Sequence, residues 1–149
     1  MRSLIRDVPI LRTDDTVAAA LERILETELP ALPVSRADGR YVGVFGEREF
    51  LTAIFPRYLG TLGYAGFLPE ELDEAIEQNA GALDEPLERH LNAEHVDLDS
   101  HAADASIAEV FLHHRVLIVP IVDRGRIIGI VRRSDFFREL ARRALDARS

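Results

Sequence analysis

The chain contains no cysteine, so it can form no disulfide and offers neither a thiolate metal ligand nor a cysteine nucleophile. It also lacks any stretch approaching the ~18 consecutive apolar residues that a membrane-spanning helix requires. Its first residues, Met1 to Asp7, do not form the apolar segment of a secretory signal. These absences lead us to expect a cytoplasmic protein that does not associate with membranes.

Motifs of several common enzyme classes are missing as well. The sequence has no glycine-rich phosphate loop, no Gly-x-Ser-x-Gly elbow and no His-Glu-x-x-His zinc motif. The acidic residues Asp84, Glu85 and Glu88 are typical of a solvated surface rather than of a catalytic carboxylate pair. We therefore expect no catalytic residues and no enzymatic activity.

The histidines do not form a metal-binding pattern. Adjacent histidines on a helix, such as His113 and His114, point in different directions and cannot share a metal as an i, i+4 pair does. His90 and Glu94 have that spacing, but the sequence offers them no evident third ligand. We expect no metal site among His90, His95, His101, His113 and His114.

Charge is distributed unevenly along a chain whose net charge is −8. Residues 70–99 contain eleven acids and a single base, Arg89, whereas residues 124–148 contain eight arginines and three acids. The acidic total opposes nonspecific binding to nucleic acid or to anionic membranes. An arginine-rich nucleic-acid surface near the C-terminus is an alternative that this total and the lack of interleaved aromatic residues disfavour.

The main positive feature is an internal repeat, in a chain of 149 residues that suits one domain. Copy one contains Asp15–Leu21, Ala31–Val34, Asp38-Gly39, Val42–Val44 and Glu49–Leu51. Copy two contains Ala105–Phe111, Ile118–Ile121, Arg124-Gly125, Ile128–Ile130 and Asp135–Phe137. The central prolines of the two copies, Pro33 and Pro120, are 87 residues apart, and the closing glycines and acids are 86 apart.

In each copy the spacing of apolar residues predicts helix, strand, turn, strand and helix in that order. We expect helices at 17–28, 47–55, 107–114 and 134–147, strands at 31–34, 41–45, 117–122 and 126–131, and leading extended segments at 8–11 and 96–99. The candidate N-caps are Thr13, Asp14 or Asp15 in copy one and Asp104 or Ser106 in copy two. Because one such unit cannot cover its own sheet, the two copies should pack together in an α/β (α+β) fold.

The segment between the copies, from Pro56 to His95, does not follow the repeat. Helical spacing follows the start signal at Pro69, and Leu83, Leu87 and Leu91 predict another short helix. The insertion is either an element that docks a partner or gates a site, or a helical spacer between the copies. We favour the spacer.

This arrangement resembles a tandem pair of cystathionine-β-synthase (CBS) domains, also called a Bateman module, of the stand-alone bacterial type. The resemblance rests on Leu32–Val34 and Val42–Val44 in copy one, and on Val119–Asp123 and Ile128–Phe136 in copy two. It implies CBS repeats at residues 5–55 and 95–146 with a helical insertion at 56–94. It also implies that the two repeats pack with pseudo-two-fold symmetry.

In the CBS family the closing aspartate accepts hydrogen bonds from ribose hydroxyls, and adenine lies between the repeats. Here that aspartate is Asp135, beside Ser134 at the start of a helix whose free N–H groups can bind phosphate. The alternative is that Ser134 or Asp135 only caps the helix. Arg132 replaces the family's Ser/Thr and, with Arg133, could clamp a phosphate; otherwise the two arginines are a solvated pair. Ile118 replaces a common basic residue, which disfavours polyphosphates.

Pseudo-symmetry implies that copy one supplies the walls of the adenine slot opposite Asp135. The expected wall residues are Val8, Pro9, Leu29, Pro30 and Ala31, together with Ile130 in the strand that precedes Asp135. All of these are equally compatible with plain core packing. The mirror site should be poorer, because Gly46 and Glu49 replace the family's Ser/Thr and Asp.

The resemblance implies a regulatory module that senses an adenosine-containing ligand of the AMP, ADP or ATP class. S-adenosylmethionine is a further candidate, and no cofactor is required. CBS pairs of this kind usually form flat homodimers, so we expect a homodimer that acts on an unknown regulated protein. The alternative is a ligand-free scaffold for dimerisation or docking.

Overall fold

The computed structural model describes residues 2–55, 69–91 and 96–148. The first half contains η1 (Arg2–Leu4), β1 (Leu11–Arg12), α1 (Val17–Thr27), β2 (Ala31–Ser35), β3 (Tyr41–Gly46) and α2 (Glu47–Ile54). The insertion contains α3 (Pro69–Gln78), η2 (Ala80–Asp84) and η3 (Leu87–His90). The second half contains β4 (Leu98–Asp99), α4 (Asp104–His113), β5 (Ile118–Asp123), β6 (Arg126–Arg132) and α5 (Arg133–Ala147).

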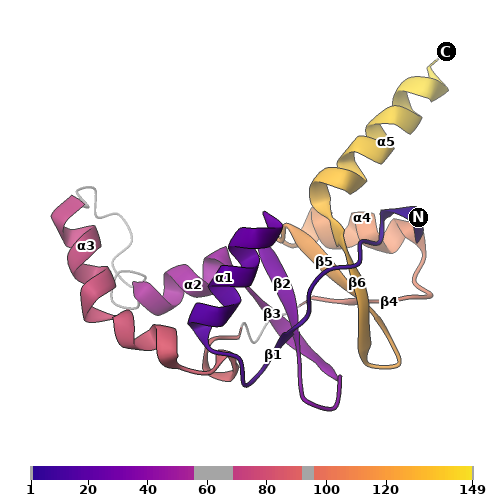
Figure 1. Cartoon of the computed structure of the whole chain (residues 1–149). Coiled ribbons are helices and arrows are strands. Elements are labelled where there is room, and N and C mark those ends of the chain that lie inside the picture. The colour runs from indigo at the N-terminus through magenta and orange to yellow at the C-terminus, as the bar shows by residue number, and fades with distance from the viewer. Residues whose placement is uncertain (1, 56–68, 92–95, 149) are drawn as a thin grey trace.

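The strands form two small sheets with the same topology (Figure 1). In each sheet a short leading strand pairs in parallel with the central strand, which then pairs antiparallel with the next strand. The two hairpin turns use glycine at matching positions, with φ of 89° at Gly39 and 80° at Gly125. Only glycine adopts such positive φ values at little cost. The predicted duplication and α/β fold are therefore confirmed.

The predicted caps of α1 and α4 were wrong by one or more residues. Thr16 caps α1, its hydroxyl oxygen accepting a hydrogen bond from the Ala19 amide at 3.1 Å. Asp15 instead accepts a hydrogen bond from the Arg12 amide at 2.9 Å, and so stabilises the turn before the helix. The N-cap residue of α4 is Ala103, which has no side chain able to cap. Several adjacent polar residues could each have capped these helices, and tertiary packing decides between them.

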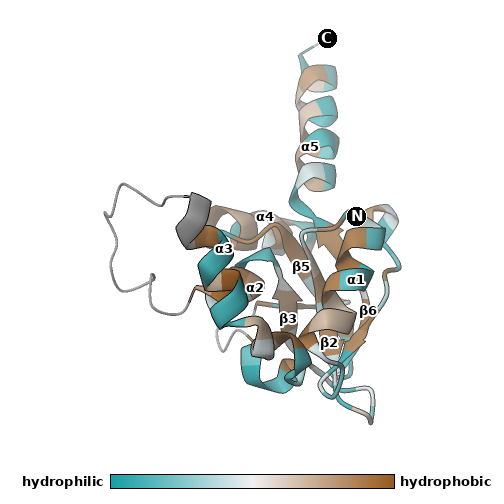
Figure 2. Ribbon diagram, turned by 60° about the vertical axis from the view of Figure 1, so that its left-hand side comes forward, coloured by the Kyte–Doolittle hydropathy of each residue, from teal (hydrophilic) through white to brown (hydrophobic). Residues whose placement is uncertain are grey.

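The two copies share a hydrophobic core. One buried cluster belongs to copy two, whereas the other combines copy one with Ile118 and Ile130 of copy two. The strands at the centre of the molecule are correspondingly apolar (Figure 2). The remaining members of the shared cluster are Leu11, Val17, Ala20, Ile24, Leu29, Leu32, Val34, Phe45 and Leu87.

The segment that precedes β1 crosses from copy one onto the sheet of copy two. The Arg6 amide donates to the Ile130 carbonyl at 2.8 Å, and the Ile130 amide donates to the Arg6 carbonyl at 3.0 Å. The crossing is close because Gly129 has no side chain: a Cβ there would lie 2.5 Å from the Arg6 carbonyl oxygen. The N-terminal segment thus joins the two halves.

The insertion packs against copy one. The Leu87 amide donates to the Asp15 carbonyl at 2.8 Å, and the Leu87 side chain is fully buried in the shared core. The short helix predicted over Leu83 to Leu91 is instead two 3₁₀ turns, η2 and η3. They are separated at Pro86, which has no N–H and cannot occupy the interior of a helix.

Candidate functional site

Two cavities lie at the junction of the copies. The larger measures about 360 Å³ and is lined by Pro30, Leu117, Arg132, Arg133, Ser134 and Phe137. The smaller measures about 160 Å³ and is also lined by Pro30 and Leu117, now together with Ala31, Glu47, Arg48 and Glu49. Each cavity therefore combines residues of both copies.

The two cavities are related by the internal repeat. Pro30 and Leu117 are equivalent positions, 87 residues apart as the central prolines are. In copy one the Glu47 amide donates to the Pro30 carbonyl at 3.0 Å, and in copy two the Arg133 amide donates to the Leu117 carbonyl at 3.0 Å. The closing helices α2 and α5 thus begin in the same way, and each cavity lies at the start of one of them.

The start of α5 is arranged to attract an anion. Its N-cap residue is Arg132, whose side chain makes no capping hydrogen bond. Arg133 and the exposed Ser134 follow directly and line the larger cavity. The Arg133 amide is already bound to the Leu117 carbonyl, but the Arg132 side chain caps none of the N–H groups that follow. A helix N-terminus of this kind, next to two guanidinium groups, favours a phosphate or carboxylate. The structure therefore brings together four predicted residues: Pro30, Arg132, Arg133 and Ser134.

Asp135 does not cap its helix but pairs with an arginine from copy one. The Asp135 Oδ2 atom accepts from Arg6 Nε at 2.7 Å, and Oδ1 accepts from Arg6 Nη2 at 3.4 Å. The Asp135 side chain is 20% exposed and that of Arg6 is 50% exposed. Asp135 borders a separate cavity of about 250 Å³, which Arg6, Arg138 and Arg142 also line. The structure therefore does not place the predicted ribose acceptor in the lining of the larger cavity, and its carboxylate is paired with the Arg6 guanidinium.

The other predicted wall residues are divided between the core and the smaller cavity. Leu29 and Ile130 are buried in the shared core and do not line either junction cavity. Val8 is half-buried and packs against the same core, and Pro9 is half-buried in the leading segment. Ala31 lines the smaller cavity. Of the predicted apolar wall, Pro30 is the member that lines the larger cavity.

In copy one, Gly46 and Glu49 occupy the positions of the family's Ser/Thr and Asp, and Glu49 lines the smaller cavity. A Cβ at position 46 would collide with the Pro30 carbonyl and with Ala31, so no serine or threonine fits there. Glu49 is half-buried, and burial raises the pKa of its carboxyl, although hydrogen bonds from the Glu49 and Gly46 amides offset part of that rise. Copy one therefore lacks both the hydroxyl and the aspartate of the family pattern, and its cavity is the smaller one.

Sequence reasoning missed Arg6, Leu117 and Phe137. Leu117 could have been found by adding the 87-residue separation to Pro30, since both line the larger cavity. Phe137 lies one turn beyond Arg133 on α5, a position that helical spacing places near the predicted site. No local signal identifies Arg6, because its contact with Asp135 spans 129 residues.

The structure also bears on metal sites and on membrane-spanning helices. Among the described residues, no three His, Asp or Glu side chains are close enough to hold one metal ion. His95 lies outside those residues. No helix within residues 2–55, 69–91 and 96–148 combines the length and apolar character needed to cross a membrane.

Comparison with known proteins identifies the same family. The CBS domain model matches residues 2–56 and 96–142. A CBS domain-containing protein of unknown function from Kribbella flavida is 19% identical, with a TM-score of 0.66 over 93% of this chain and 96% of that one. The CBS domain of a membrane protein from Sphaerobacter thermophilus is 25% identical, with a TM-score of 0.65 over 91% and 83%. No curated protein matches.

A third similar structure contains a pair of CBS domains. The CBS domain pair/ACT domain protein of Thermotoga maritima is 17% identical, with a TM-score of 0.65 over 95% of both chains. Both halves of the duplicated fold thus coincide with the two matched segments, and the insertion falls between them. The chain belongs to the CBS domain family as a tandem pair of repeats, a class of regulatory modules that commonly bind ligands.

Proposed function

We propose that this CBS pair senses an adenosine-containing ligand of the AMP, ADP or ATP class in the larger junction cavity. The observation that supports this proposal is the composition of that cavity. Its volume of about 360 Å³ falls within the range of roughly 300–1,000 Å³ typical of small-molecule sites. Its lining combines apolar residues with adjacent arginines at a helix start that no N-cap side chain caps.

These two kinds of lining residue suit the two parts of a nucleotide. Pro30, Leu117 and Phe137 offer apolar surface for a base. Arg132 and Arg133 offer guanidinium groups that bind phosphate oxygens in bidentate fashion. Because Ile118 supplies no further cation, a monophosphate is favoured over a triphosphate.

Ribose binding requires Asp135 to exchange partners. A carboxylate has two acceptor oxygens and suits a vicinal diol, but here both oxygens face the Arg6 guanidinium. We infer that the ligand displaces Arg6 from Asp135 when its ribose binds. Since Arg6 belongs to the segment that crosses between copies, this exchange would change how the halves are joined, and an unknown regulated protein would respond to that change.

A thermal-shift series tests the proposal. The Tm is measured with AMP, ADP, ATP and S-adenosylmethionine in turn. A ligand present at about 100 times its Kd adds ~2.7 kcal/mol of stability and so raises the Tm. We expect AMP to raise the Tm, Asp135→Asn to abolish that rise, and Asp146→Asn, an exposed acid on the same helix, to preserve it. The double variant Arg132→Ala/Arg133→Ala should weaken the binding of AMP more than the binding of adenosine, which has no phosphate. A Tm that no adenosine compound changes contradicts the proposal.

A second candidate is a ligand-free dimerisation or docking scaffold. The Arg6–Asp135 ion pair favours it, because the carboxylate that would receive ribose already has a cationic partner. If the chain is a ligand-free scaffold, no adenosine compound should change its Tm. Adding these compounds should also leave the association of the chain with itself unchanged. The same series of measurements therefore separates the two candidates.

A further inference from the structure

A cavity of about 570 Å³ lies between α2 and the insertion, and it is larger than either junction cavity. Helix α2 contacts η2 and η3, and η2 contacts α3. Residues of all four elements line the cavity. These elements lie at the end of the molecule opposite to α5 (Figure 1). We call this space the insertion cavity.

The insertion cavity is separate from the nucleotide site proposed above. It shares no lining residue with the larger junction cavity and only Glu49 with the smaller one. Its insertion wall, within residues 78–91, lies between the two segments that the CBS domain model matches. Its volume falls within the range of roughly 300–1,000 Å³ typical of small-molecule sites. A ligand here would be recognised largely by residues outside the family pattern.

Two polar groups of the insertion wall face each other without a hydrogen bond. Glu85 Oε2 accepts from Arg89 Nη1 at 3.0 Å, whereas Glu85 Oε1 lies 3.6 Å from His90 Nε2, which is beyond hydrogen-bond distance. His90 Nε2 is buried and has no hydrogen-bond partner among the described residues. A buried polar atom without a partner costs free energy. The hydrogen bonding of this wall is therefore incomplete without a further group.

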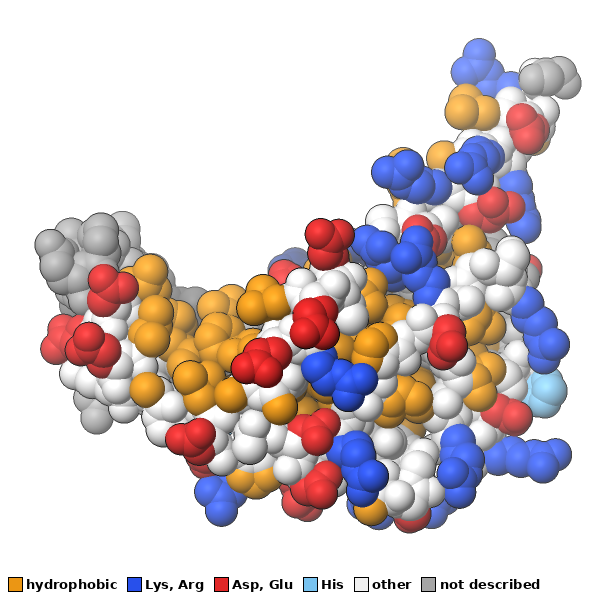
Figure 3. All heavy atoms as spheres, viewed as in Figure 1, with side chains coloured by type: hydrophobic (Ala, Val, Ile, Leu, Met, Phe, Trp, Pro, Cys, Tyr) orange, Lys and Arg blue, Asp and Glu red, His pale blue; other side chains and the backbone are white. Residues whose placement is uncertain are grey.

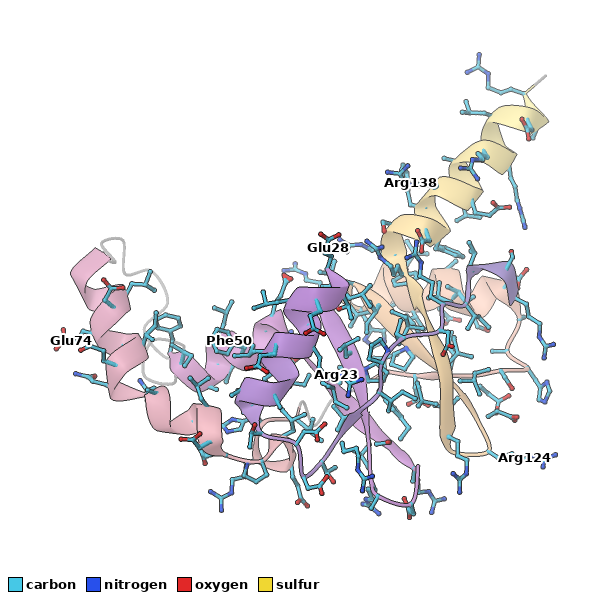
Figure 4. The ribbon with its side chains drawn as sticks, viewed as in Figure 1. Arg23, Glu28, Phe50, Glu74, Arg124 and Arg138 are labelled. Carbon is cyan, nitrogen blue, oxygen red and sulfur yellow. The ribbon has the colours of Figure 1, made fainter. Side chains whose placement is uncertain are left out.

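The charge around the insertion cavity favours a cation. Glu49 and Glu85 line it, and Arg89, the arginine of the described lining, is already bound to Glu85. Residues 69–88 contain eight acids and no base. Figure 3 shows acidic side chains gathered over α3, and Figure 4 shows Glu74 projecting from that helix. Charges of one sign around a cavity concentrate ions of the opposite sign within it.

We propose that the insertion cavity binds a small organic cation through a primary ammonium group, with the carboxylates of Glu85 and Glu49 as its hydrogen-bond acceptors. An ammonium group has three N–H donors and no acceptor, so it suits a wall whose unsatisfied atoms are a carboxylate oxygen and an imidazole nitrogen. Ala53, Ala82 and Leu91 offer apolar lining for a short alkyl chain. A metal ion is disfavoured, because no three His, Asp or Glu side chains within the described ranges are close enough to hold one.

The test uses butylammonium chloride as the probe, titrated into the isotope-labelled chain and followed by NMR. In n-butanol and sodium butyrate the same alkyl chain carries a neutral and an anionic head group, and sodium chloride controls for ionic strength. We expect butylammonium to shift the amide signals of Gly81 and Ala82, which line the cavity, until they saturate. The amide signal of Gly125, in the second hairpin, should not move. The three comparison compounds should shift none of these signals at the same concentration.

Glutamine variants then identify the acceptors. Glu85→Gln should raise the Kd for butylammonium about tenfold, because a hydrogen bond to a charged acceptor becomes one to a neutral acceptor. Glu49→Gln should weaken binding as well, and it provides the test if Glu85→Gln does not fold. The control is Glu88→Gln, which changes an exposed acid of η3 outside the cavity lining and should bind as the wild type does.

The dispersion of the NMR signals also reports whether each variant is folded. The proposal is overturned if butylammonium causes no saturable shift, or if n-butanol or butyrate shifts the same amides equally. It is also overturned if the folded glutamine variants of the cavity bind the probe as tightly as Glu88→Gln does. No nucleotide is present in these titrations, so their outcome does not depend on the function proposed for the junction cavity.

Discussion

The guanidinium of Arg6 lies 2.7 Å from the carboxylate of Asp135, and this ion pair connects the first segment of the chain to the first turn of its last helix. The contact joins the two repeats at the carboxylate that we propose as the ribose acceptor. Both side chains are partly exposed, so the pair contributes ~1 kcal/mol or less to folding. A ligand can therefore replace Arg6 at a modest cost.

Removing Arg6 should strengthen ligand binding. In Arg6→Ala the Asp135 carboxylate has no cation to release, so the cost of breaking the pair disappears from the binding free energy. We expect the Kd for AMP, measured by titration calorimetry, to fall by up to about fivefold, since 1.4 kcal/mol corresponds to tenfold. Arg2→Ala, an exposed arginine near the same terminus, serves as the control. Weaker binding in Arg6→Ala would show instead that the guanidinium contacts the nucleotide.

Most of the fold could be predicted from the repeat. The two hairpins and the helices at both ends of each copy follow from patterns that lie close together in the sequence. The approach of Pro30 to the start of α5 was implied by the pseudo-symmetry of a tandem CBS pair. Once the two copies are aligned, a helix or strand assigned in one copy can be compared with the equivalent residues of the other.

The features that could not be predicted depend on long-range packing. Arg6 reaches Asp135 because the leading segment pairs with β6, and nothing near Arg6 in the sequence indicates that crossing. Leu29 was predicted to face the ligand, but the apolar character that suggested this also suits the core, where it lies. An apolar residue beside a predicted site is ambiguous until the packing is known.

Glu49 should make the stability of the protein depend on pH. Burial raises the pKa of its carboxyl above the ordinary value of 4.5, so the folded chain holds this proton more tightly than the unfolded chain does. The resulting stabilisation is complete below the ordinary pKa and is lost as the pH rises through the raised one. Glu49→Gln cannot titrate, so the difference between its Tm and the Tm of the wild type should increase in favour of the variant as the pH rises above about 4.5.

The matched control for this measurement is Glu47→Gln, which changes an exposed carboxylate in the same turn of α2. Its Tm should follow that of the wild type across the same range. If the Tm difference between Glu49→Gln and the wild type is the same at every pH, the buried carboxyl is not responsible for any pH dependence of folding.

Gly129 should tolerate no side chain. A Cβ there would lie 2.5 Å from the Arg6 carbonyl oxygen and 2.7 Å from Ile5 Cγ2, so the leading segment must move away from β6. Overpacking of this kind costs roughly 1–3 kcal/mol. We expect Gly129→Ala to lower the unfolding free energy by that amount and to speed hydrogen exchange at the Arg6 amide. Gly81→Ala is the control, because a Cβ at Gly81 meets no atom within 4 Å.

Leu87 should be as important to stability as a core residue of either repeat, although it belongs to the insertion. Its side chain is fully buried in the core shared by the two copies. Truncating a buried leucine to alanine costs about 2–5 kcal/mol, because apolar contacts are lost and a cavity remains. For a domain of this size that loss lowers the Tm by roughly 4–20 °C.

Denaturant unfolding of Leu87→Ala measures this cost, with Leu112→Ala as the control. Leu112 is 80% exposed on α4, so its truncation removes little buried surface and should change the unfolding free energy by less than about 0.5 kcal/mol. If both variants were equally stable, the insertion would be an appendage that folds separately from copy one. A large loss confined to Leu87→Ala would mean that the segment between the repeats and the first repeat unfold together.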